Sequence, residues 1–436
     1  MVAAVPDENL RRTVTPATSI TPDVPARSSA TPPPAPPARA TARGLIIVLG
    51  ALTAVAPLAT DMYVPGFPAL GRALHASSAA VQLTMTAFLA GLVVGQLVVG
   101  PISDGLGRRR LLIGGSAGFT LFSVAAAAAP NIGLLTGARF LQGVTGAAGM
   151  VLARAVLTDR FHGRELPRYF ALLSQIMSVA PIAAPIIGGA VLSVSTWRTV
   201  FVVLTAMGVA LLVGVLRAVP ESLPPERRHR GGIASTFRAM GTLLRHRVFM
   251  GNVLVLGFAS AALFTYIAGS SFVFEDLHGV SASTYSLIFA TNAVGMLIAG
   301  AVFSRLSPRV RLNTLLTVGV ALTSLGAIAQ VVLRLTLGES LAGTWITLFI
   351  VVGGIGLILP ASVSIGQAVT RHAPGAASAL LGGLQFFLGA LASPLVGLFG
   401  TGSSLPMAVI MLIAMACALL ALFTLARPWE GGGESR

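Results

Sequence analysis

Long apolar stretches recur along the chain between residues 44 and 426, separated by short polar connections. A helix that crosses a bilayer needs roughly 20 apolar residues, and its backbone polar groups must be bonded internally because lipid offers them no partner. The pattern therefore predicts an all-α membrane protein with twelve transmembrane helices. We place the spans at residues 44–64, 79–101, 110–129, 132–157, 168–192, 199–219, 248–272, 282–303, 312–333, 342–369, 375–400 and 403–426.

Basic residues gather in every second connection. The loops after the even-numbered spans are rich in arginine, whereas those after the odd-numbered spans contain only Arg72, Arg198 and Arg334. Cytoplasmic loops retain Arg and Lys, so we expect both termini to lie in the cytoplasm. This topology accounts for the net charge of +15, and we expect no nucleic-acid partner.

The composition excludes several kinds of chemistry. The chain has no lysine, so it lacks the Lys of a phosphate-binding P-loop and the amine of a Schiff base. Its one cysteine, Cys417, lies in the last span and allows neither an internal disulfide nor a Cys-x-x-Cys site. No cluster of His, Cys or acidic residues suited to catalysis lies inside the spans. We therefore expect no enzyme activity, cofactor or metal site.

The chain divides by composition. Residues 1–43 are rich in proline and arginine and too polar to fold alone, which predicts a disordered cytoplasmic tail. The alternative is a cleaved signal peptide ending at Ala54-Val55-Ala56, which Pro57 and the continuing apolar run disfavour. We expect further units at residues 44–220 (first six-helix half), 221–247 (cytoplasmic central loop), 248–427 (second six-helix half) and 428–436 (cytoplasmic tail).

The two six-span halves contain an internal repeat. Residues 100–108, G-P-I-S-D-G-L-G-R, follow span 2, and a degenerate copy at residues 300–309 follows span 8. The second copy has Ser304 where the first has Asp104. Two pseudo-symmetric six-helix halves are typical of a transporter that rocks about a substrate site between them.

Several motifs resemble those of one family. Residues 100–110 resemble the loop 2–3 signature of the major facilitator superfamily, and residues 139–143, R-F-L-Q-G, its R-x-x-Q-G motif. Residues 184–189 are similar to the antiporter motif G-P-x-x-G-G, with Ala184 in place of the first glycine. Residues 60–65, T-D-M-Y-V-P, look like the T-D-M-Y-L-P segment of the bicyclomycin and chloramphenicol resistance branch of this family. That branch consists of drug:proton antiporters.

The resemblance suggests roles for the motif residues. Asp104 is expected to contact the start of span 11 near Pro374 and so latch the two halves on the cytoplasmic side; the alternative is an ordinary basic loop. The gate motif consists of Gly100, Asp104, Gly107, Arg108 and Arg109. The antiporter motif consists of Pro181, Pro185, Gly188 and Gly189, which also read as a kinked, closely packed helix.

Three ionisable residues lie well inside the predicted spans: Asp61, Arg139 and Arg154. Such residues are costly in lipid and are functional candidates. At 1.5 Å per residue, Asp61 and Arg139 reach a similar depth, so we expect them to couple protons to transport, Asp61 as the proton acceptor. Alternatively, Asp61 caps span 1 and Arg139 forms a structural pair. Arg154 lies near the cytoplasmic end, where its side chain can reach the interface.

The sequence says least about the substrate cavity. Its candidate residues are Phe88, Phe264, Tyr266, Phe289, Gln385 and Phe386, although core packing or lipid contact explains each of them better than substrate contact does. We expect a monomer in the plasma membrane that contacts lipid, exports drug-like molecules and imports protons. The alternative is a proton-coupled transporter of one small metabolite.

Overall fold

The computed structural model of the 436-residue chain describes residues 39–163, 165–228, 238, 240–370 and 374–430. Over these residues the secondary structure is helical, and twelve helices are long and apolar enough to span a bilayer. The predicted all-α membrane fold is therefore confirmed. Residues 1–38 of the expected tail, and Arg371 in the loop before span 11, lie outside the described residues.

The first six spans come from seven α-helices. They are α1 (Arg39–Asp61), extended by the short helices η1 (Val64–Gly66) and α2 (Phe67–Ala73), then α3 (Ser78–Leu106), α4 (Arg108–Ala127), α5 (Ile132–Arg160), α6 (Glu165–Val194) and α7 (Trp197–Ala218). The first helix begins at Arg39, five residues before the expected start of span 1. We call α1 to α7 the first half.

The last six spans form the second half, which follows η2 (Pro225–Arg227). It contains α9 (Arg247–Ser271), η3 (Phe272–Leu277), α10 (Ala282–Leu306), α11 (Leu312–Leu337), α12 (Leu341–Val369), α13 (Pro374–Ala392), α14 (Leu395–Phe399), α15 (Leu405–Ala421), η4 (Leu422–Ala426) and η5 (Pro428–Glu430). The π-helical turn η3 continues α9 to Leu277, beyond the expected end of span 7 at residue 272.

Local sequence signals set where several of these helices begin. Ser77, Asn131, Ser281 and Ser340 each accept a hydrogen bond from a backbone N–H in the first turn of the helix that follows. These caps satisfy donors that the helix itself leaves free. Gly107 separates α3 from α4 with a φ of 96°, a conformation that glycine adopts without steric cost.

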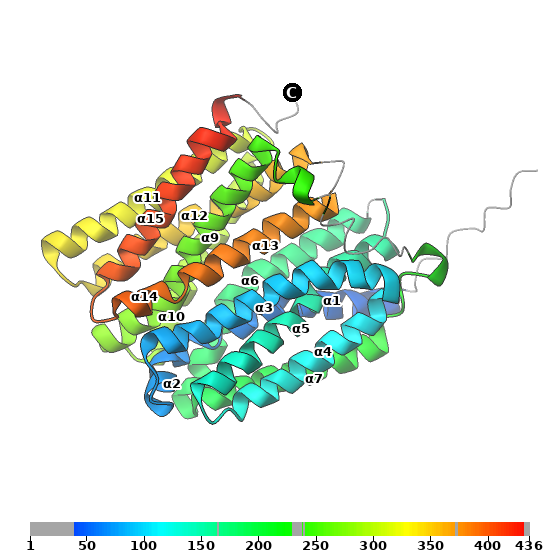
Figure 1. The fold of residues 1–436 in the computed structure, drawn as a ribbon, viewed down its shortest axis with the longest axis horizontal. Coiled ribbons are helices and arrows are strands. Elements are labelled where there is room, and N and C mark those ends of the chain that lie inside the picture. The colour runs from blue at the N-terminus through cyan, green and yellow to red at the C-terminus, as the bar shows by residue number, and fades with distance from the viewer. Residues whose placement is uncertain (1–38, 164, 229–237, 239, 371–373, 431–436) are drawn as a thin grey trace, which may run out of the picture. The chain divides into compact units, whose positions relative to one another are not determined.

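Two pairs of helices make the most extensive contacts between the halves. Helix α3 packs against α13, and α6 packs against α10, while α1 packs within the first half against α5, α6 and α7. Figure 1 shows α3 and α13 side by side. We call the helix ends next to Arg108, Arg160 and Arg305 the arginine-rich end. The arginine-poor end carries α2 and the loops near residues 130, 195, 278, 339 and 402.

Candidate functional site

Asp61 lies at the last residue of α1 and is buried, with 4% of its surface exposed. Its Oδ1 accepts a hydrogen bond of 2.8 Å from Thr60 Oγ1. The short helix η1, which follows Asp61 after two residues, packs against α9 and α10 of the second half. The acid therefore belongs to the first half but lies close to the surface where the halves meet.

Arg139 of α5 is completely buried beside the same part of α1. Its Nη2 donates to the carbonyl of Ala59 at 3.0 Å, and its Nη1 donates to Gln142 Oε1 at 2.5 Å. Gln142 Nε2 in turn donates to Ser123 Oγ of α4 at 2.7 Å. Within the described residues, the ion pairs do not include Arg139 or Asp61.

Three aromatic rings surround the Arg139 guanidinium. Its carbon lies 4.2 Å from the ring centre of Phe88, 5.0 Å from that of Tyr63 and 5.6 Å from that of Phe201. The negative faces of aromatic rings attract a cation, and such contacts are stronger where water is excluded. The Ala59 carbonyl, the Gln142 amide and the faces of three rings thus surround this charge. Phe88, a candidate for the substrate cavity, contacts Arg139 in this state.

The remaining aromatic candidates form two packed groups in the second half. Tyr266 stacks on Phe289 with ring centres 5.2 Å apart, and Phe264 lies 6.0 Å from Phe386. Tyr266, Phe289 and Phe264 are buried, whereas Phe386 and Gln385 are half-buried. Asn292 Nδ2 donates to Tyr266 Oη at 3.1 Å. The four rings pack on one another in two pairs in this state, and their role as substrate contacts stays a prediction.

The antiporter-motif glycines allow two close backbone approaches. A side chain at Gly188 would collide with the backbone of Met62, the residue after Asp61. One at Gly189 would collide with Ser286 of α10, across the interface between the halves. Pro181 and Pro185 lie earlier in the same helix, α6. Small residues are what allow membrane helices to approach this closely.

The gate motif at the arginine-rich end is tied into the first half. Asp104 is half-exposed and accepts from Arg108 Nη1 at 2.7 Å, while Arg108 Nε lies 3.3 Å from Asp159 Oδ2. The backbone N–H groups of Arg108 and Arg109 donate to the Glu221 carboxylate at 2.9 and 3.3 Å. Such a carboxylate stabilises the positive N-terminus of α4.

The rest of the motif adds packing and anchoring contacts. Arg109 Nε donates to the carbonyl of Val219 at 2.9 Å, and Gly100 packs near Val151. The sequence did not point to Asp159, near the end of α5, or to Glu221, in the segment after α7. The expected contact of Asp104 with the start of span 11 adjoins residues 371–373, which lie outside the described residues. That contact stays a prediction.

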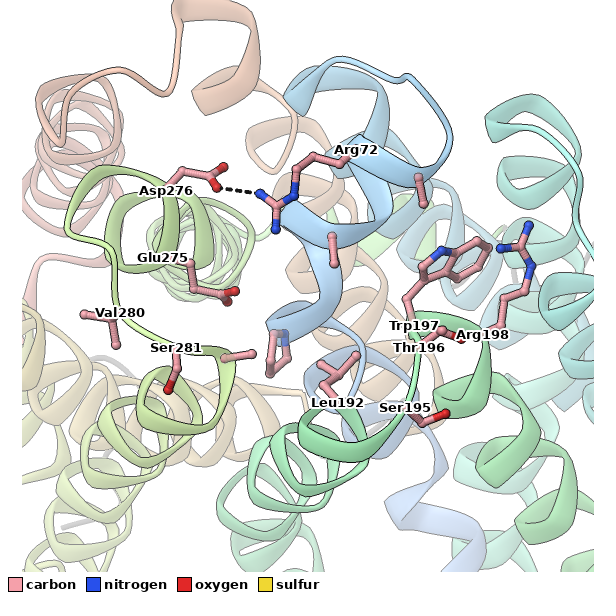
Figure 2. Close-up of a pocket in the computed structure, with 14 residues that line it drawn as sticks. Arg72, Leu192, Ser195, Thr196, Trp197, Arg198, Glu275, Asp276, Val280 and Ser281 are labelled. Carbon is pink, nitrogen blue, oxygen red and sulfur yellow. Dashed lines mark hydrogen bonds and ion pairs between the residues drawn. The ribbon is translucent and has the colours of Figure 1, made fainter.

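A groove with a cavity volume of about 540 Å³ lies at the arginine-poor end, between the two halves. Figure 2 shows Arg72 of α2 paired with Asp276 of η3 at 3.0 Å across it. Glu275 points into the same groove, and its Oε1 is enclosed without a hydrogen-bond partner. The sequence placed Glu275 in a loop, but the π-helical turn that continues α9 brings it to the interface.

Twelve spanning helices in two groups, with buried polar residues where the groups meet, define the class of membrane transporters that work by moving two halves. Residues 49–394 match the family described as the Major Facilitator Superfamily. The chain belongs to that family. It is a multi-pass membrane transporter of small molecules and not an enzyme.

Relatives with known names agree with this family. The chain is 40% identical over 389 residues to the uncharacterized MFS-type transporter YdgK of Bacillus subtilis, covering 89% of this chain and 96% of that one. It is 28% identical to the bicyclomycin resistance protein homolog of Haemophilus influenzae, covering 87% and 95%. It is 29% identical to the multidrug transporter MdfA of Yersinia pestis, covering 76% and 81%.

A solved structure shares the fold. The bacterial homolog of the human lysosomal transporter Spinster aligns with a TM-score of 0.72 at 16% identity, covering 90% of this chain and 99% of that one. At this identity the likeness concerns the fold alone. The named relatives, and not this structure, support the resemblance to the drug-efflux branch of the family.

Proposed function

We propose that this protein exports drug-like small molecules across a bacterial plasma membrane in exchange for protons. The observation that carries the proposal is the burial of Asp61 just before η1, the segment that packs against the second half. Ionisable residues are rare inside membrane proteins and mark proton or substrate pathways. The names of the relatives, which include bicyclomycin resistance and multidrug transport, support the substrate class.

In this proposal, Asp61 exchanges its proton as the halves move. A carboxyl that water reaches from the outside in one state and from the cytoplasm in the other can take up a proton outside and release it inside. Arg139 keeps its charge throughout, because a guanidinium is not deprotonated in proteins. Its bond to Ala59 holds that charge two residues from Asp61 in every state in which α1 and α5 stay together.

The orientation follows from the loop charges. We propose that the arginine-rich end faces the cytoplasm, together with both termini. Arg72–Asp276, Ser78–Thr401 and Ser283–Gly189 are polar contacts between the halves, and all three lie at the arginine-poor end. Their position supports a state closed to the outside. Because one chain contributes both halves, we propose that a monomer carries out transport.

The substrate is expected to bind between the halves near the membrane midplane. Phe264, Tyr266, Phe289, Gln385 and Phe386 supply mostly apolar surface with a few polar groups from the second half. That composition suits drug-like molecules. Separation of the halves then exposes these residues to the cavity.

Antibiotic susceptibility of cells that produce the protein tests the proposed export. We expect raised resistance to several drug-like antibiotics, and loss of that resistance when a protonophore collapses the proton gradient. The result would favour the metabolite alternative if susceptibility to a broad panel of antibiotics stays unchanged. In that case the protein should transport one metabolite with the proton gradient, and only close analogues of that metabolite should compete with it.

A further inference from the structure

Gln82 of α3 makes two hydrogen bonds from the first half to the second. Its Nε2 donates to the backbone carbonyl of Ala268 in α9 at 3.1 Å. Its Oε1 accepts from the backbone N–H of Gly397 in α14 at 2.7 Å. The residue is completely buried. One side chain therefore satisfies two main-chain groups of the opposite half.

Both of those groups lie where a helix of the second half departs from regular geometry. In a regular α-helix the N–H of Phe272 would bond the carbonyl of Ala268, but here it bonds that of Gly269, where the π-helical turn η3 begins. Gly397 lies in the first turn of α14, after the break at Ser393 and Pro394, where N–H groups have no partner within the helix.

The surrounding packing leaves little room for another arrangement. A side chain at Gly397 would collide with the backbone of Ala79 and with Gln82 itself. A carbonyl can only accept and an N–H can only donate, so the amide of Gln82 has one orientation that satisfies both groups. Glutamine is the uncharged side chain that offers a donor and an acceptor at this reach.

We propose that Gln82 is a two-point clasp that keeps the arginine-poor end closed and that must release on each transport cycle. This inference rests on the proposed alternating movement of the halves. Opening that end separates α3 from α9 and α14 and leaves the two backbone groups to water. Gln82 is thus a positioning residue that sets the balance between the two states without contacting substrate.

Spin labels on the full-length protein can measure this balance. In a Cys417→Ser background, labels at Ala73→Cys and Leu337→Cys report the separation of the two halves at the arginine-poor end. We expect Gln82→Leu to raise the ratio of open to closed molecules about tenfold, since both bonds are lost. Gln82→Met has nearly the length of glutamine and also removes both bonds, so it should produce a similar rise and serves as the second variant if Gln82→Leu folds poorly.

Gln96→Leu is the matched control. Gln96 lies on the same helix and faces Gly382 of α13 across the interface between the halves. The clasp is contradicted if both Gln82 variants keep the distance distribution of the parent, or if Gln96→Leu shifts it equally. These distances are measured without substrate or gradient, so a failure of the parent to transport drugs would overturn the exporter proposal and leave this result standing.

Discussion

Arg139 donates a hydrogen bond of 3.0 Å to the backbone carbonyl of Ala59. This bond joins α5 to α1 two residues before Asp61, whose own carboxylate is bonded to Thr60. The buried cation is thus held on the helix that carries the acid, by contacts with Ala59, Gln142 and aromatic rings that do not include the Asp61 carboxylate.

Replacement of Arg139 by lysine tests whether this geometry matters in addition to the charge. A lysine ammonium is a point charge and cannot reproduce the planar contacts with Ala59 and Gln142. Hydrogen bonds to charged groups contribute about 1.5–3 kcal/mol, so we expect Arg139→Lys to lower the unfolding temperature and to impair transport. Arg154→Lys, on an exposed position of the same helix, is the control and should change neither. Equal behaviour of the two variants would contradict a positioning role for Arg139.

Gly189→Ala tests the close approach of α6 and α10. The added methyl group collides with Ser286, so the halves must separate at the arginine-poor end or the helices must shift. We expect faster passive proton entry into liposomes that contain the variant. Overpacking in a tight contact typically costs about 1–3 kcal/mol, which should also lower the unfolding temperature.

Gly353→Ala is the control for this prediction. A methyl group at Gly353 of α12 meets open space, so the same change in sequence should leave proton entry and stability unaltered. If Gly189→Ala liposomes are as proton-tight as the parent, the contact does not seal the interface.

Asp104→Asn tests the latch at the arginine-rich end. The change removes the charge that pairs with Arg108 and, in the predicted latch, attracts the start of span 11. Distances between spin labels at His162→Cys and Arg309→Cys should shift toward the open arrangement, with expression retained. Ser304→Asn, at the equivalent position of the second-half copy, should not shift them. Identical distances in Asp104→Asn and the parent would contradict a latch role for Asp104.

Glu339 predicts a pH dependence of stability. Burial raises the pKa of this carboxyl, but hydrogen bonds from Ser404 and Ser403 and the charge of Arg334 outweigh burial and lower the pKa from its usual 4.5. The contribution of ionised Glu339 to the stability of the fold is therefore present above about pH 4.5. It is lost as the pH falls through the lower pKa that this carboxyl has in the folded state. The parent should unfold at a higher temperature than Glu339→Gln at pH 7, and the difference should shrink below pH 4.5. A difference that stays constant down to pH 3 would contradict this linkage.

The sequence predicted the spans well because hydrophobicity alone determines which segments enter a bilayer. It also identified Asp61 and Arg139, because charge inside an apolar run is conspicuous. It could not reveal their partners, because Ala59 contributes only its carbonyl and the rings come from two helices and the turn after α1. Glu275 was assigned to a loop because a π-helical continuation leaves no clear mark in composition. Gln82 escaped notice because both of its partners are backbone groups, far away in sequence.

Asp61→Asn in reconstituted liposomes tests the central claim most directly. The substitution keeps the volume of the side chain and removes the acid proposed to carry the proton. Drug movement driven by an imposed pH gradient is measured for the parent and the variant, with drug exchange down its own gradient measured in parallel. We expect the parent to accumulate drug when a pH gradient is imposed. Asp61→Asn should retain exchange and lose accumulation. Full pH-driven accumulation by Asp61→Asn would contradict the role of Asp61 as the proton carrier.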